Sequence, residues 1–171
     1  MNNHWKRFDS RIEILQMTIL GLEKLNLELR KKTDTINWYD GLWLLEESEP
    51  ICGLAFIAFQ NYINSSIFDR FESLEKQYLK YKIGDSITGT ERTDIELIIS
   101  IANYFKHRDH PDNLTGETAK ILNDFNLQFD KDVDITNSPI FKGLEILSED
   151  WDLQVVIKAV QRWREKLWII E

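Results

Sequence analysis

Apolar side chains recur every three or four residues along most of the chain, which is the period of an α-helix. In the first such segment, Ser10 and Glu13 have the spacing of a capping box, a common helix start. The apolar positions that follow share one helical face: Ile12, Ile14, Leu15, Ile19, Leu22, Leu25 and Leu29. Only 7 Gly and 3 Pro interrupt the chain, and no alternating apolar and polar run persists. The sequence therefore predicts an all-α protein.

Two of the predicted helices are apolar on nearly all sides. The first covers residues 51–71, with Pro50 in its first turn, and follows a separate short helix over residues 38–45. The second covers residues 94–106 and opens with another capping box, Thr93 with Glu96. A helix without a broad polar face usually lies in the protein interior. We therefore expect a single-domain helical bundle of about five to seven helices packed around these two.

The composition adds limits on the class of protein. The chain has 171 residues with 29 acidic and 21 basic side chains, a formal net charge of −8, and no Gly-, Ser- or Pro-rich linker divides residues 1–171 into domains. The single cysteine, Cys52, excludes an intramolecular disulfide framework and a cysteine-based zinc site. The first residues are too polar for a signal peptide. The longest run of apolar residues and glycine, residues 51–59, is shorter than the roughly 20 residues that cross a bilayer. We expect a cytoplasmic protein with no membrane partner.

A row of polar side chains follows the second apolar helix. Glu96, Ser100, Asn103 and His107 are spaced by four, three and four residues, so they share a narrow sector, and His110 extends the row if the helix continues. Such a row is either a strip facing water or the wall of a cleft. Ser and Asn are unfavourable inside a helix, and solvated strips usually consist of Lys, Glu and Gln. This composition is an argument for the cleft, although a solvated strip is the commoner outcome.

The same helix ends in a basic cluster, residues 106–110, within an otherwise acidic protein. We assign catalytic roles to His107, Asn103 and Glu96, with His107 transferring protons near neutral pH. We assign ligand and phosphate binding to the neighbouring residues Lys106, Arg108 and His110. Gln60 and Asn64 of the first apolar helix would form the facing wall of the site. The alternative is that these cations only interact with the helix dipole, which favours positive charge at a C-terminus.

An acidic cluster precedes the first apolar helix and offers a candidate metal site. Glu46, Glu47 and Glu49 supply the carboxylate oxygens that Mg²⁺ prefers. With Asp69 and Glu72, the cluster resembles the paired acidic motifs of all-helical nucleotide pyrophosphohydrolases, although that family has Glu-x-x-Asp where this chain reads Asp-x-x-Glu. The alternative is a solvated charged segment between helices.

Two segments resemble a group of bacterial all-helical proteins. They are residues 101–107, Ile-Ala-Asn-Tyr-Phe-Lys-His, and residues 53–63 of the first apolar helix. The related superfamily that we name is HEPN, whose members are similar in size and helical layout. This resemblance implies a metal-independent ribonuclease or the toxin half of a toxin-antitoxin or phage-defence system. The catalytic signature of that superfamily, an Arg followed after four to six residues by a His, is absent here.

The sequence leaves three function classes open. The first is a nucleic-acid-processing or nucleotide-phosphate-binding protein, a possible ribonuclease or nucleotide hydrolase, without a required cofactor. Because the net charge of −8 opposes broad contact with nucleic acid, RNA or a nucleotide would bind at a small local basic site. The second is a non-enzymatic interaction module, such as an immunity or antitoxin protein with a basic partner. The third is a Mg²⁺-dependent nucleotide hydrolase. A homodimer is compatible with each class.

Overall fold

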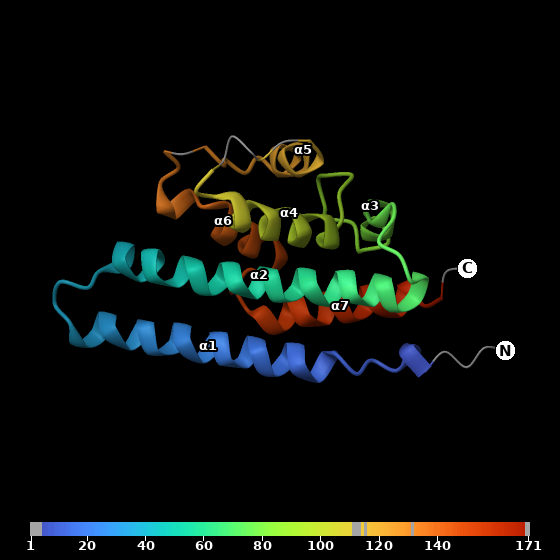
Figure 1. Cartoon of the computed structure of the whole chain (residues 1–171). Helices are drawn as coiled ribbons and strands as arrows, with labels where there is room; N and C mark the ends of the chain where they lie inside the picture. Colours follow the sequence, from blue (N-terminus) through green and yellow to red (C-terminus); the bar gives the residue numbers. More distant parts are fainter. Residues whose placement is uncertain (1–4, 111–113, 115, 131, 170–171) are drawn as a thin grey trace.

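The protein is a bundle of α-helices (Figure 1). The structure is a computed structural model, and it describes residues 5–110, 114, 116–130 and 132–169. Across these residues there is no β-strand, only an isolated bridge between Ser86 and Thr93, so the all-α prediction is confirmed. The helices are α1 (Ile12–Thr35), α2 (Gly41–Phe71), α3 (Gln77–Tyr81), α4 (Asp94–His107), α5 (Glu117–Asp124), α6 (Pro139–Leu147) and α7 (Leu153–Leu167), with short 3-10 helices η1 (Trp5–Arg7) and η3 (Ile135–Asn137).

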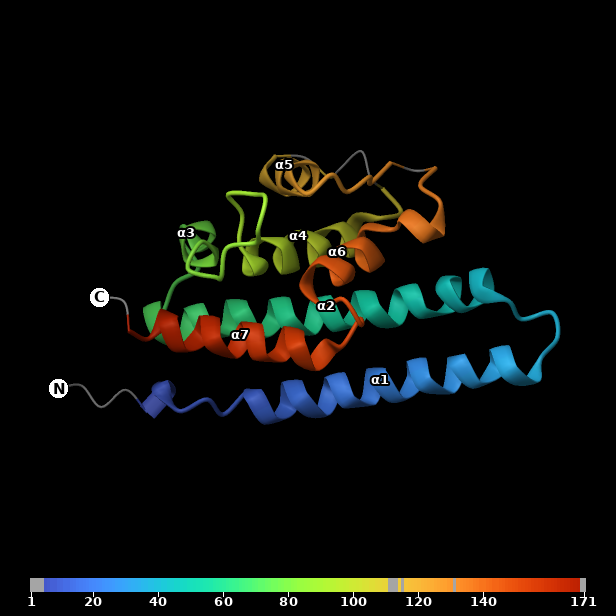
Figure 2. The same ribbon diagram turned by 180° about the vertical axis from the view of Figure 1, so that it is seen from behind.

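α2 lies at the centre of the bundle, with α1 antiparallel beside it (Figure 1). α7 packs along the back of α2, which the reversed view shows (Figure 2). α4 and α6 cover another side of α2, and α5 lies outermost, over α4. Large side chains fill the space between these helices, among them Phe56 and Phe59 of α2, Phe141 of α6 and Trp163 of α7, all of them buried. This layering positions α4 between α2 and α5.

α2 is one helix of 31 residues that continues through Pro50, so the predicted separation of a short helix over residues 38–45 is wrong. The carboxylate of Asp40 caps its start. Pro50 lacks the N–H that would bond to the preceding turn. The residues before it are nevertheless held by tertiary contacts, because Glu47 bonds to a lysine of α1 and Glu49 to an arginine after α4. These contacts outweigh the local tendency of proline to start a helix.

The two predicted capping boxes had different outcomes. In α4 the Thr93 hydroxyl accepts a hydrogen bond from the Glu96 N–H, and the Glu96 carboxylate accepts one from the Thr93 N–H. At the start of α1 the residue in the cap position is Arg11, and no side chain caps the helix. Arg11 instead forms an ion pair with Asp69 of α2, Nε to Oδ2 3.0 Å. Contact with α2 therefore replaces the local cap.

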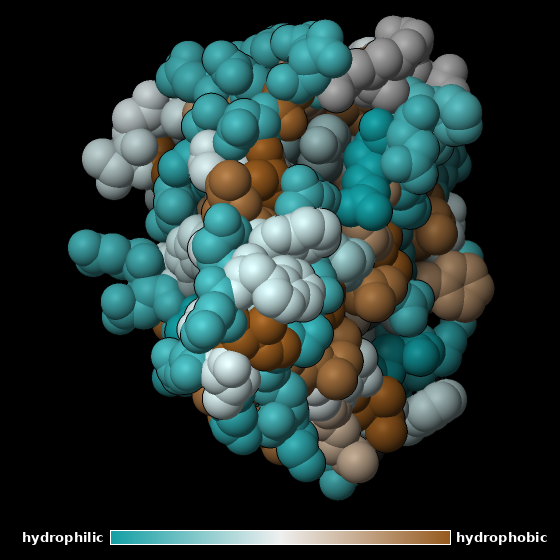
Figure 3. Space-filling model, turned by 90° about the vertical axis from the view of Figure 1, so that its left-hand side faces the viewer, coloured by the Kyte–Doolittle hydropathy of each residue, from teal (hydrophilic) through white to brown (hydrophobic). Residues whose placement is uncertain are grey.

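The outer side of the α1–α2 hairpin exposes apolar side chains. We call this surface the hairpin face; its uncharged residues are Ile14, Thr18, Gly21, Leu25, Leu54, Ala58, Asn61 and Ser65. Ile14 is 65% exposed, Leu25 53% and Leu54 51%. A groove of about 430 Å³ separates the two helices there. Seen from the end of the bundle that carries the α1–α2 turn, apolar surface lies between hydrophilic regions (Figure 3).

α2 also has the length and composition of a membrane-spanning helix. Its most apolar window has a mean hydropathy of 1.2, and half of that window is buried inside the protein. A core helix of a soluble protein has the same properties. The cytoplasmic location stays a prediction.

Candidate functional site

The polar edges of α2 and α4 meet in the structure. Gln60 Nε2 donates a hydrogen bond of 2.9 Å to Asn103 Oδ1. Asn103 Nδ2 in turn donates one of 3.2 Å to the hydroxyl of Thr118 on α5. One turn further along α2, Asn64 Oδ1 accepts a hydrogen bond of 2.8 Å from the hydroxyl of Tyr81. Three members of the polar row of α4, Glu96, Ser100 and Asn103, therefore line a cleft between α2 and α5, whereas His107 does not.

A cavity of about 560 Å³ opens beside this network, between α2, α3, α4 and α5. Its volume falls in the range of small-ligand pockets, about 300–1,000 Å³. Neutral polar groups form much of its lining: Gln60, Asn64, Gln77, Ser100, Asn103 and Thr118. Such a lining can form hydrogen bonds with the polar groups of a ligand, and these amide and hydroxyl groups carry no net charge.

Three lysines surround the cavity: Lys82, Lys106 and Lys120. Their side chains are exposed, and none of them has an ion-pair partner among the residues that the structure describes. Desolvation lowers the pKa of Lys106 from its ordinary value. The cavity thus brings together unpaired cations that come from three separate parts of the chain.

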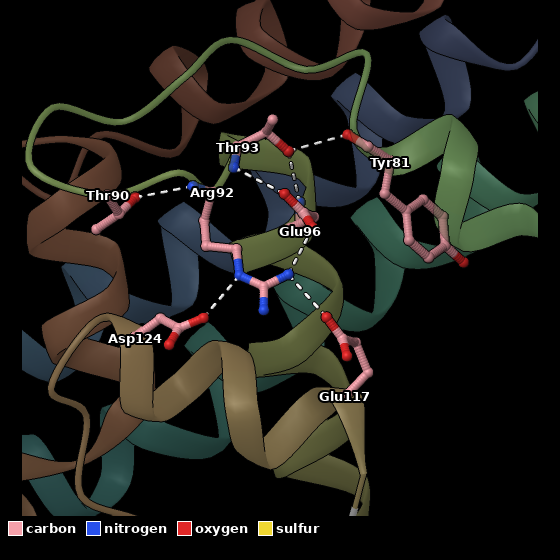
Figure 4. Close-up of polar contacts among 7 residues, drawn as sticks. All are labelled: Tyr81, Thr90, Arg92, Thr93, Glu96, Glu117 and Asp124. Carbon is pink, nitrogen blue, oxygen red and sulfur yellow. Dashed lines mark hydrogen bonds and ion pairs between the residues drawn. The ribbon is translucent and has the colours of Figure 1, made fainter.

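The two carboxylates that line the cavity, Glu96 and Glu117, are both bound to Arg92 (Figure 4). Arg92 Nη1 lies 3.0 Å from Glu96 Oε1 and 2.7 Å from Glu117 Oε1, and its Nε lies 2.8 Å from Asp124 Oδ2. Burial alone would lower the pKa of Arg92, but hydrogen bonds to Asp124, Glu117 and Glu96 outweigh it and raise the pKa above its usual range. Arg92 occupies oxygens of these carboxylates but supplies one positive charge against three negative charges, so the three lysines leave only a small local excess of positive charge.

Two buried polar atoms of the cavity lining have no hydrogen-bond partner within the described part of the chain: the hydroxyl of Ser100 and the carboxamide oxygen of Gln77. Ser100 is only 1% exposed. Buried polar groups are nearly always hydrogen-bonded, and an unpaired one is unfavourable. Because both residues line the cavity, a ligand bound there is a candidate partner for these two atoms.

Other predicted site residues lie away from the cavity. His107 and His110 are exposed and do not line it. Arg108 follows the last turn of α4 and points elsewhere, since its Nη1 lies 2.7 Å from Glu49 Oε2 and its guanidinium covers the ring of Phe105. Glu96 lines the cavity, yet its oxygens are occupied by the helix cap and by Arg92. The structure therefore joins Gln60, Asn64, Asn103 and Lys106 and separates the histidines and Arg108 from them.

The three glutamates proposed as a metal site do not converge. Glu47 accepts hydrogen bonds from Lys32 and from the hydroxyl of Tyr39. Glu49 is bound by Arg108 and by the Ser138 hydroxyl, whereas Glu46 is exposed. In the described ranges, no group of three or more His, Cys, Asp or Glu side chains is arranged to hold a metal ion. The geometry gives no support to a magnesium site.

Sequence reasoning missed part of the cavity. Lys82 was visible as part of a basic segment with Lys76 and Lys80, but no pattern linked it to α4. Lys120 and Thr118 lie on α5, whose packing against α4 joins residues that are far apart in sequence. No sequence pattern predicted that Arg92 is buried either, because an isolated arginine before a helix is usually exposed.

Comparison of the chain with protein-family models, with curated proteins and with solved structures finds no match. The resemblance to HEPN proteins stays a prediction, and the function is argued from the site alone.

Proposed function

We propose that this protein binds a small phosphate-bearing ligand of the nucleotide class in the cavity between α2, α3, α4 and α5. The observation that carries the proposal is the convergence of three unpaired lysines, Lys82, Lys106 and Lys120, on a cavity whose carboxylates are already bound to Arg92. Phosphate oxygens accept several hydrogen bonds and carry the opposite charge, so they match this set of donors.

The net charge of the protein limits the size of such a ligand. At −8 the surface as a whole repels an extended polyanion, whereas the cavity brings three lysines together. A mononucleotide, or the end of a nucleic-acid strand, fits this distribution better than a duplex. The proposal is for binding; proton transfer by His107 is not part of it, because that side chain does not line the cavity.

Isothermal titration calorimetry with AMP, GMP, CMP and UMP tests the proposal. We expect binding that weakens as salt increases, and that weakens about 10-fold in Lys106→Gln and in Lys120→Gln, since a charge-assisted hydrogen bond contributes about 1.5–3 kcal/mol.

The control variant is Lys158→Gln, which changes an exposed lysine of α7 outside the cavity and should bind like the original chain. The proposal fails if none of the four nucleotides binds. It also fails if the control Lys158→Gln weakens binding as much as Lys106→Gln and Lys120→Gln do.

A second candidate function, an interaction module, is favoured by the hairpin face. The occupant that we assign to it is a second copy of this chain. Among the described residues, the only charged one that lines the groove of this face is Arg11, which pairs with Asp69 of the same chain, so two copies that each carry −8 can meet there with few like charges in contact. Apolar surface of this kind often marks an interface.

Sedimentation velocity distinguishes this second candidate. A dimer should dissociate in Leu25→Glu, which places a charge at the centre of the hairpin face, and should persist in Leu79→Glu, an exposed leucine of α3. A monomer at all concentrations rules out the second copy as occupant.

A further inference from the structure

The cavity contains an arrangement that the lysines do not explain. Ser100 lies in the middle of α4, is nearly fully buried and belongs to the cavity lining, and its hydroxyl has no partner in the described residues. A serine inside a helix commonly bonds back to the carbonyl of the preceding turn. Here the hydroxyl makes no such bond, so both its donor and its acceptor capacity are unused.

Further unpaired groups lie beside it. Gln77 contributes a buried carboxamide oxygen, which can only accept a hydrogen bond. Asn64 uses its oxygen to accept from Tyr81, so its N–H groups remain to donate. α2 and α4 run antiparallel (Figure 1), and Gln60 pairs with Asn103, so Asn64 lies one turn back along α4, at the level of Ser100. The side chains of Ser100, Gln77 and Asn64 thus offer hydrogen-bond donors and acceptors together, and none of the three is charged.

An aromatic ring completes the arrangement. Tyr78 of α3 lines the cavity and is 52% exposed, so one part of its ring is free to stack against a ligand. Base stacking on exposed aromatic rings is a common element of nucleotide binding. Lys106 lies six residues after Ser100, roughly 9 Å along the helix axis at 1.5 Å per residue. That distance leaves room for a sugar between a group bound at Ser100 and a phosphate bound at Lys106.

We infer that the neutral part of this cavity, formed by Ser100, Gln77, Asn64 and Tyr78, binds the nucleobase of the ligand. This inference rests on the proposed binding of a phosphate-bearing ligand and adds the source of its specificity. A nucleobase is planar, neutral, and presents donors and acceptors along one edge, so it satisfies the unpaired atoms while its face stacks on the tyrosine. A sugar phosphate or inorganic phosphate would leave these atoms unpaired.

The test compares the four nucleoside monophosphates with ribose 5-phosphate and inorganic phosphate by calorimetry. We expect at least one nucleotide to bind about 10-fold or more tightly than ribose 5-phosphate, because a hydrogen-bonding site discriminates strongly against a ligand that leaves its buried groups unpaired. Ser100→Ala should remove most of this preference and leave the affinity for ribose 5-phosphate unchanged. Tyr78→Leu, a change at an exposed position, should also reduce the preference.

Thermal unfolding of the same variants separates binding from folding. Ser100→Ala removes a buried hydroxyl that has no partner, so the Tm without ligand should stay the same or rise. The matched control is Ser66→Ala, because Ser66 of α2 is also fully buried with an unpartnered hydroxyl but does not line the cavity. Ser66→Ala should change the Tm only slightly and should leave the preference for nucleotides unchanged.

The outcomes distinguish the two levels of the proposal. If nucleotides and ribose 5-phosphate bind equally, base recognition is wrong while phosphate binding stands. If Ser100→Ala keeps the full preference for nucleotides, the base does not bind at Ser100. If no phosphate compound binds, both the proposed function and this inference are wrong.

Discussion

The α4 cavity and the hairpin face depart from the usual distribution of residues in opposite ways. At the cavity, hydroxyl, carboxamide and carboxylate groups are drawn into the interior along α4, where Glu96 and Ser100 are nearly inaccessible to water. On the hairpin face, Ile14, Leu25 and Leu54 are more than half exposed. Buried polar groups and exposed apolar patches are the informative exceptions to the rule that apolar residues lie inside.

The two regions differ in whether their unusual groups, buried polar ones at the cavity and exposed apolar ones on the hairpin face, find partners within the chain. Around the cavity most buried polar groups are paired within the chain, as Arg92 pairs with Glu96, and few atoms remain for a ligand. On the hairpin face the apolar groups are left more than half exposed, without cover from the part of the chain that the structure describes. The α4 region should therefore be sensitive to substitution, and the hairpin face tolerant.

The largest expected effect is at Arg92. Arg92→Met leaves the carboxylate of Glu96 buried without its cation, and breaking a buried pair in this way costs about 3–5 kcal/mol of unfolding free energy. Denaturation by urea measures it. The matched control is Arg162→Met, whose half-exposed ion pair with Asp85 should contribute less than about 1 kcal/mol. Equal losses in the two variants would contradict the contrast between a buried and an exposed pair.

A smaller effect is expected where α2 and α4 approach closely. A Cβ atom at Gly53 would lie 2.4 Å from the ring of Phe105. Gly53→Ala should therefore force the ring to move and destabilise the protein by about 1–3 kcal/mol.

The corresponding glycine of the hairpin face provides the comparison. At Gly21 an added Cβ would meet nothing within 4 Å. Gly21→Ala should stabilise the protein by about 0.5–1 kcal/mol, because glycine loses more backbone freedom in a helix than alanine does. If both substitutions change the unfolding free energy in the same direction, the two regions do not differ in packing as the structure indicates.

The most subtle effect concerns pH. Burial raises the pKa of Asp94, the first residue of α4, to about 6, although backbone N–H groups of Ile95 and Asp85 bond to its carboxylate. The pKa of an unfolded Asp is about 3.9, so the folded protein binds this proton more tightly. Asp94 therefore stabilises the fold at low pH, and this contribution is lost as pH rises through about 6.

Asp94→Asn tests this dependence. At about pH 7.5 the variant should be more stable than the original chain by about 1–2 kcal/mol, and the difference should shrink towards about pH 4.5. Urea denaturation at several pH values measures the difference. A difference that is constant with pH would show that ionisation of Asp94 is not its cause.

Local spacing was sufficient for α4. The capping box, the length of the helix and its polar row all follow from which residues lie three and four positions apart, and the structure contains each of them. The same reasoning failed at Pro50 and at Ser10, where contacts with other helices decide the outcome. It also grouped His107 and Arg108 with Asn103, although neither lines the cavity and Arg108 pairs with Glu49.

The sequence by itself determined an all-α protein with two apolar helices and an unusual polar row, because helix periodicity, caps and burial tendency are local properties. Tertiary packing sets the rest: Gln60 meets Asn103, Lys82 and Lys120 join Lys106, and Arg92 binds Glu96 and Glu117. These contacts depend on how each helix is rotated about its axis and where the loops return the chain. The packing of the whole core sets both, and no local pattern records them.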